Sequence, residues 1–141
     1  MASKRVRPGG SVLGVDLKRL DKIDDNVATV VGDVRVESTL ERLITELRGL
    51  ADVVLSDLSP DVSGVWDLDH QRQVDLTLRV IDAFPSLLKR DGNAVLKIFQ
   101  GERFEEVRSR LKEDFQIVKL VKPKASRSES SEMYFVCLHF R

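Results

Sequence analysis

The chain has little of several features that would assign it to a class at once. It contains one cysteine, Cys137, so no intrachain disulfide can form, which fits a reducing compartment. Its longest apolar runs, such as MYFVCLHF, fall far short of the roughly 20 residues that span a bilayer. The opening segment MASKRVRPGG lacks the apolar stretch of a signal peptide. We therefore expect a cytoplasmic protein with no membrane partner.

An excess of charge of one sign is also missing. The 23 basic and 23 acidic residues cancel, so the molecule as a whole has no broad field that attracts a polyanion. Basic side chains gather only locally, in three clusters: Lys4, Arg5 and Arg7; Lys18, Arg19 and Lys22; and Lys119, Lys122, Lys124 and Arg127. For each cluster alone, a solvated surface is as good an interpretation as a nucleic-acid contact. An RNA partner would therefore have to bind at a local basic cluster rather than through the charge of the whole molecule.

The remaining composition is that of a globular protein. Charged residues make up 33% and hydrophobic residues 42% of 141 residues, enough for one compact domain with a sizeable core. We expect residues 1–141 to form a single domain. No G-x-G-x-x-G motif follows a predicted strand, which disfavours a nicotinamide-binding Rossmann domain.

Strand-like and helix-like segments alternate along the chain. The pattern predicts strands over 11–17, 27–31, 51–58, 93–99, 115–121 and 133–140 and helices over 38–48, 70–89 and 104–112. Alternation predicts an α/β fold with a covered, mostly parallel sheet, because a parallel return needs a long crossover. The last two strands are joined by the polar loop KPKASRSESS without a helix. One antiparallel strand is therefore expected at the end of the chain.

Polar residues suggest where two of these helices begin. Ser38 and Glu41 have the spacing of a capping box at the start of the first helix. Asp67 or Asp69 is expected to cap the second helix.

Three ionisable side chains lie at or beside the ends of predicted strands. They are Asp57 in VVLSDLSPDVSG, Lys97 in NAVLKIFQGE and Glu132 in SRSESSEMYFV. In an open α/β sheet, ligands bind in the crevice outside the strand ends. We therefore expect these three side chains to meet in one pocket at one rim of the sheet.

The surroundings of these residues support a site but leave alternatives. Asp57 would be expelled from an apolar strand unless it lies at the open end, where Pro60 and Gly64 turn the backbone. Lys97 is either an edge or snorkelling residue, or one desolvated enough to lose its proton. Trp66 either packs or stacks on a nucleobase, and packing is the preferred interpretation.

Taken together, SDLSPDVSG, KIFQGE and SRSESSE resemble the FtsJ/RrmJ-like RNA ribose 2′-O-methyltransferases of the large-subunit methyltransferase E type. The likeness runs from about residue 9 to residue 140. It implies a Rossmann-like methyltransferase sheet, mostly parallel with one antiparallel strand. It also implies S-adenosyl-L-methionine as methyl donor and RNA as substrate, namely a uridine of 23S-type ribosomal RNA within a ribosomal subunit. The resemblance further implies that Lys97 is the general base or orients the 2′-oxygen, and that Asp57 and Glu132 complete the catalytic group.

The same resemblance implies binding roles for other residues, and no metal. Asp16 would contact the cofactor ribose, Asp33 the adenine edge, and Asp57 would lie close to the methyl donor. Lys124 and Arg127 would hold RNA phosphates, contacts that position RNA without reading its sequence. For Asp16 or Asp33 alone, turn or helix capping remains the stronger interpretation.

The chain departs from the family at its start. Residues 1–141 contain neither the family's first strand and helix, nor its glycine-rich cofactor loop, nor its first catalytic lysine; RPGG is interpreted as a turn. We therefore expect weak or no S-adenosyl-L-methionine binding by this chain alone. The strands flanking the missing one, 11–17 and 51–58, pair directly, receive a strand from a second copy or another partner, or belong to a shortened enzyme. The alternative function is a catalytically inactive module that binds RNA or a protein.

Overall fold

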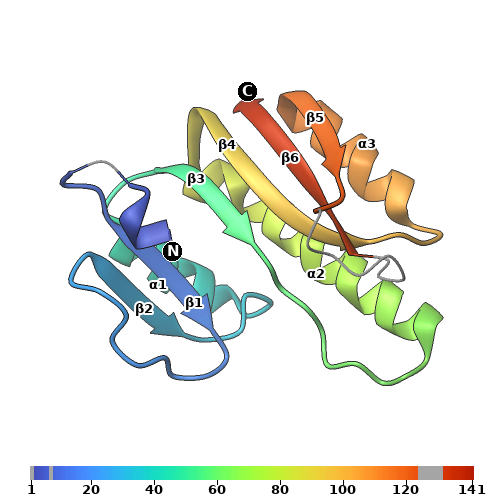
Figure 1. Cartoon of the computed structure of the whole chain (residues 1–141), viewed down its shortest axis with the longest axis horizontal. Helices are drawn as coiled ribbons and strands as arrows, with labels where there is room; N and C mark the ends of the chain where they lie inside the picture. Colours follow the sequence, from blue (N-terminus) through green and yellow to red (C-terminus); the bar gives the residue numbers. More distant parts are fainter. Residues whose placement is uncertain (1, 7, 124–131) are drawn as a thin grey trace. The chain divides into compact units, whose positions relative to one another are not determined.

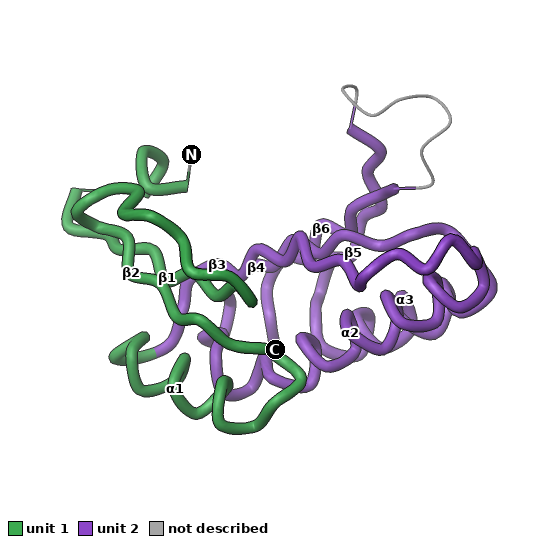
Figure 2. Tube along the Cα trace, turned by 90° about the horizontal axis from the view of Figure 1, so that it is seen from below, with its two compact units in different colours: residues 1–49 green, residues 50–141 purple. Residues whose placement is uncertain are grey.

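The computed structural model describes residues 2–6, 8–123 and 132–141 (Figure 1). The chain divides into two compact units, Met1–Gly49 and Leu50–Arg141 (Figure 2). The single domain expected for residues 1–141 stays a prediction. No helix in the described ranges has the length and apolar character needed to cross a membrane.

The first unit is a parallel strand pair with one helix. After the 3-10 turn η1 (Ala2–Lys4), strands β1 (Val12–Asp16) and β2 (Val27–Val31) pair in parallel, from Val12↔Val27 to Asp16↔Val31. Helix α1 (Glu37–Leu47) follows and buries Leu40 and Leu43. The predicted capping box is wrong: Ser38 lies inside the first turn, the N-cap is Val36, and no side chain caps the helix.

The second unit is a four-stranded sheet with two helices on one face. Its strand order is β3 (Ala51–Ser56), β4 (Leu88–Phe99), β6 (Glu132–Phe140) and β5 (Phe115–Val121). β3 runs parallel to β4, and β6 runs antiparallel to both of its neighbours. Figure 2 shows α2 (Trp66–Leu87) and α3 (Phe104–Asp114) on the same side of these strands. The predicted α/β class and the single reversed strand are confirmed.

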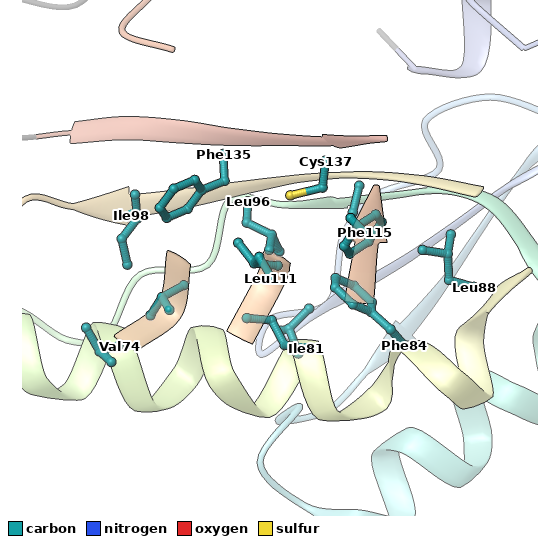
Figure 3. Close-up of a cluster of buried hydrophobic side chains, with 13 residues drawn as sticks. Val74, Ile81, Phe84, Leu88, Leu96, Ile98, Leu111, Phe115, Phe135 and Cys137 are labelled. Carbon is teal, nitrogen blue, oxygen red and sulfur yellow. The ribbon is translucent and has the colours of Figure 1, made fainter. Parts of the chain in front are cut away.

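The core lies between the helices and the sheet of the second unit (Figure 3). Side chains at alternate positions of β4 and β6 face it, because neighbouring residues of a strand point to opposite faces. They include Leu96, Ile98, Phe135 and Cys137, all fully buried. Burial raises the pKa of the Cys137 thiol to about 12. The cysteine is therefore a packing residue.

The sheet differs from the prediction by being divided in two. The sequence predicts one sheet, whereas β1 and β2 form one sheet and β3 to β6 another. β1 and β3 are the strands expected to flank the family's first strand, and neither sheet contains both. The alternative in which these two strands pair directly is therefore wrong.

The start of α2 also differs from the prediction. The helix begins at Trp66, four residues before the predicted start, and Val65 is its N-cap. Neither Asp67 nor Asp69 caps it, because no side-chain cap hydrogen bond is made. At its other end the chain passes from Leu87 directly into β4 at Leu88. β4 therefore starts five residues before the predicted residue 93. The prediction missed its first residues because residues 89–91 are charged, and the strand was predicted from its apolar residues.

Candidate active site

Lys97 lies near the end of β4 and points away from the core. Its neighbours Leu96 and Ile98 face the core, so Lys97 projects from the opposite face of the sheet. Its side chain is only 10% exposed. The Nζ atom donates a hydrogen bond to the main-chain oxygen of Asp57 at 3.0 Å and lies 3.3 Å from Asp57 Oδ1. The amine is thus fixed by the residue that follows β3.

Tyr134 links this pair to Glu132. It lies directly opposite Lys97 in the β4–β6 ladder. Its hydroxyl donates to Glu132 Oε1 at 2.6 Å and lies 3.1 Å from Asp57 Oδ1. The hydrogen bond to Glu132, followed by burial and the charge of Asp57, raises the pKa of Tyr134. The phenol therefore keeps its proton and acts as a donor between two carboxylates.

The structure thus brings Asp57, Lys97 and Glu132 together at one rim of the sheet, with Tyr134 between them. Tyr134 was missed from the sequence. The available signal was its spacing: a polar group two residues after Glu132 in a strand lies on the same face as the glutamate.

Asp69 fixes the loop that follows Asp57. Its carboxylate accepts hydrogen bonds from the Ser63 main-chain N–H at 2.8 Å, the Ser63 hydroxyl at 2.7 Å and the Gly64 N–H at 3.1 Å. These bonds, the Ser63 N–H first, lower the pKa of Asp69. Gly64 adopts φ +86°, a conformation that favours glycine. The end of the SPDVSG string, at Ser63 and Gly64, is therefore tied to α2.

Gln73 of α2 holds the end of β4. The last β3–β4 pair is Ser56↔Leu96, and β4 continues beyond it. There the buried Gln73 amide donates to the Lys97 main-chain oxygen at 2.8 Å, and its oxygen accepts from the Phe99 N–H at 3.4 Å. Gln73 is 1% exposed. It therefore fixes the backbone on which Lys97 is mounted.

Replacing Gln73 by leucine is expected to lower the free energy of unfolding by about 1–3 kcal/mol, because two buried main-chain groups lose their partner. Amide hydrogen exchange at Phe99 should accelerate more than exchange at Leu96. Urea denaturation and exchange mass spectrometry measure the two effects. Gln71→Leu, an exposed position on the same helix, is the matched control, expected to shift stability by about 0.5 kcal/mol or less. Equal effects of both substitutions would contradict the role given to Gln73.

The first unit places Asp16 and Asp33 at the same end of its strand pair. Asp16 ends β1, and its Oδ1 accepts from the Lys18 N–H at 2.8 Å. Asp33 follows β2 and is held by Arg35 through Nε at 3.0 Å and Nη2 at 2.6 Å. Hydrogen bonds from the Arg35 side chain, then from its main chain, lower the pKa of Asp33. A nucleoside contact at Asp33 would therefore have to share the carboxylate with Arg35.

The two predicted RNA contacts, Lys124 and Arg127, lie outside the described residues. The roles predicted for them, and for Asp16 and Asp33, stay predictions.

Comparison with known proteins gives a consistent family. The profile of the family described as FtsJ-like methyltransferase matches residues 1–140. The ribosomal RNA large subunit methyltransferase E of Methanothrix thermoacetophila is 41% identical over 128 residues, which are 91% of this chain and 50% of that protein. The enzyme of the same name from Cenarchaeum symbiosum is 44% identical over 132 residues, 94% of this chain and 66% of that protein.

A solved structure agrees with the sequence relatives. A crystal structure described as a ribosomal RNA methyltransferase from Plasmodium falciparum matches with a TM-score of 0.82 and 25% identity, over 99% of this chain and 76% of that one. The chain spans about half the length of the first of the curated relatives above.

Proposed function

The chain belongs to the FtsJ-like methyltransferase family, and from this premise we propose that it transfers a methyl group from S-adenosyl-L-methionine to a ribose 2′-hydroxyl of RNA. The proposed substrate is a uridine of large-subunit ribosomal RNA within a ribosomal subunit. The observation that carries the proposal is the position of Lys97. Its amine lies at the sheet rim, 3.0 Å from the Asp57 main-chain oxygen and 3.3 Å from the Asp57 carboxylate, next to a tyrosine bonded to Glu132.

Each member of this cluster has a proposed role. Lys97 donates a hydrogen bond to the ribose 2′-oxygen and holds it in line for transfer, which is catalysis mainly by orientation. The Asp57 carboxylate receives the proton that the hydroxyl loses and, being 77% exposed, passes it to water. Tyr134 donates to Glu132 and keeps this second carboxylate beside the rim.

We assign binding of the nucleoside part of the donor to the first unit. S-adenosyl-L-methionine supplies a methyl group activated by a positively charged sulfur. Two carboxylates at the same end of a parallel strand pair fit its nucleoside part, because ribose hydroxyls and the adenine amino group are hydrogen-bond donors. Asp16 is exposed, and a carboxylate has capacity for more than the one bond from Lys18. Asp16 would hold the ribose and Asp33 the adenine edge.

Methyl transfer to RNA tests the proposal directly. The 141-residue chain is expected to label the large-subunit RNA of undermethylated ribosomal subunits when labelled S-adenosyl-L-methionine is supplied in large excess, which offsets the weak donor binding expected of this chain alone. A methyl group on the 2′-oxygen blocks attack of that oxygen on the adjacent phosphate, so alkaline hydrolysis should leave the label in an uncleaved dinucleotide. Label released as mononucleotide would place the methyl group on a base and reject the proposed reaction. Absence of label would reject activity of this chain.

RNA is proposed to bind at the rim of the sheet where Asp57, Lys97 and Glu132 meet. A strand from a second copy or another protein, predicted to fill the slot beside 51–58, stays a prediction. β3 is the edge strand of its sheet, so its outer side is where such a strand would pair.

A further inference from the structure

Trp66 is the one tryptophan of the chain and the first residue of α2. Its ring stacks on His70, with centroids 6.4 Å apart and planes at 16°, and it meets Phe99 at 6.2 Å and 41°. It packs, as the sequence predicts, yet the residue remains 52% exposed. A large aromatic surface is therefore supported from beneath and open above.

The support beneath Trp66 is rigid. His70 is 3% exposed, and its Nε2 accepts from the Arg103 main-chain N–H at 3.2 Å. A Cβ placed on Gly101 would lie 2.6 Å from the His70 ring, so only glycine fits there. Burial, and then the charge of Arg103, lower the pKa of His70. A tightly packed imidazole thus limits the movement of the Trp66 ring on the side of His70, which reduces the entropy lost on binding.

This aromatic surface borders the candidate active site. Phe99 is two residues beyond Lys97 on the same face of β4, a separation of about 7 Å. Phe99 lies opposite Glu132 on β6, just as Lys97 lies opposite Tyr134. Lys97, Tyr134, Glu132 and Phe99 are therefore four neighbours on one sheet face, and Trp66 extends this group outward from Phe99.

We propose that Trp66 and Phe99 form a stacking platform for a nucleobase of single-stranded RNA, that of the target nucleotide or of its direct neighbour. This inference rests on the proposed function and adds the way in which the RNA is held. Exposed aromatic rings bind unpaired bases by stacking on them. The chain has no net charge to draw RNA in, so a contact that depends on bases rather than on phosphates suits it.

Trp66 itself provides the first test, since excitation at the long-wavelength edge of the absorption band selects this single indole over Tyr134. Titration with a short single-stranded oligouridylate is expected to quench the emission with saturation. The same oligomer with abasic positions keeps its phosphates and lacks its bases, and it should quench weakly or not at all. Equal quenching by both oligomers, or by neither, would overturn the platform.

Substitution gives the second test, with labelled oligouridylate and anisotropy as the readout. Trp66→Leu keeps an apolar side chain over His70 and is expected to weaken affinity by about 5- to 150-fold, the range of one lost base stack. Trp66→Phe, which retains an aromatic face, should recover most of the affinity. Circular dichroism establishes that both variants fold. A Trp66→Leu protein that binds like the parent would overturn the inference.

The two proposals fail in distinguishable ways. If Trp66 is quenched by base-containing RNA while no methyl group is transferred, the platform stands and the enzymatic function falls. If methyl transfer depends on Lys97 while Trp66→Leu leaves KM for RNA and the binding affinity unchanged, the function stands and the platform falls.

Discussion

Lys97→Met is expected to reduce methyl transfer to RNA by roughly 10²-fold or more, because misplacing a reacting atom by about 1 Å can cost that much. Methionine keeps the length of the side chain and its apolar packing, while it removes the amine that Asp57 fixes. The loss should therefore appear in kcat, with the affinity for RNA and the thermal midpoint of unfolding close to those of the parent. Single-turnover transfer of labelled methyl groups measures it.

Lys119→Met is the matched control for this prediction. Lys119 is an exposed lysine on β5, opposite Val136, and by strand alternation lies on the same sheet face as Lys97. Its loss should change the rate of transfer less than severalfold. If both substitutions have the same effect, the activity depends on general positive charge, and the site assignment fails.

Lys97→Arg separates the two roles that the sequence leaves open for the lysine. Arginine stays protonated at all working pH values, so it cannot remove the hydroxyl proton, yet it still donates hydrogen bonds. Substantial activity in this variant would support orientation of the 2′-oxygen and exclude a basic amine. Loss as complete as in Lys97→Met would favour proton abstraction by Lys97.

The sequence predicted the strand centres well because apolar runs of strand length report burial directly. Residues 27–31 and 115–121 match β2 and β5 without change. Helix starts were predicted less well. Ser38 had a capping spacing and Asp69 a capping position, but α1 makes no side-chain cap and Asp69 binds the loop at Ser63 instead. Local spacing cannot reveal that a carboxylate has a better partner in a preceding loop.

In the candidate site too, the sequence revealed residues that stand out in a local pattern and missed residues whose roles depend on contacts distant in the sequence. Asp57, Lys97 and Glu132 were found because each places a charge at the end of an apolar strand. Tyr134 and Gln73 were missed, because their roles depend on partners far away in the sequence: Tyr134 lies 77 residues from Asp57, and Gln73 lies 24 residues from Lys97. Hydrogen-bond networks of this kind become visible only when the strands and helices are assembled.

Phe84→Ala is expected to have the largest effect on stability, a loss of about 3–5 kcal/mol in the free energy of unfolding. Phe84 is fully buried near the end of α2 (Figure 3). Its ring meets Phe115 edge-on at 5.5 Å and Phe140 at 6.1 Å, so alanine would leave a cavity and remove two aromatic pairs. Typical domains are stable by only about 5–15 kcal/mol, so the variant should unfold at much lower urea concentration.

Two further variants show whether packing is the cause of this loss. Phe84→Leu fills more of the space and should cost less than the alanine change, since smaller volume changes are better tolerated. Val62→Ala, at a position 75% exposed, should shift stability by about 0.5 kcal/mol or less. Phe84 is in α2, four residues before β4 begins, whereas Lys97 lies near the far end of β4. The folded fraction of Phe84→Leu should therefore keep the parent's rate of methyl transfer. A Phe84→Ala protein as stable as Val62→Ala would show that the helices and sheet of the second unit do not pack as described.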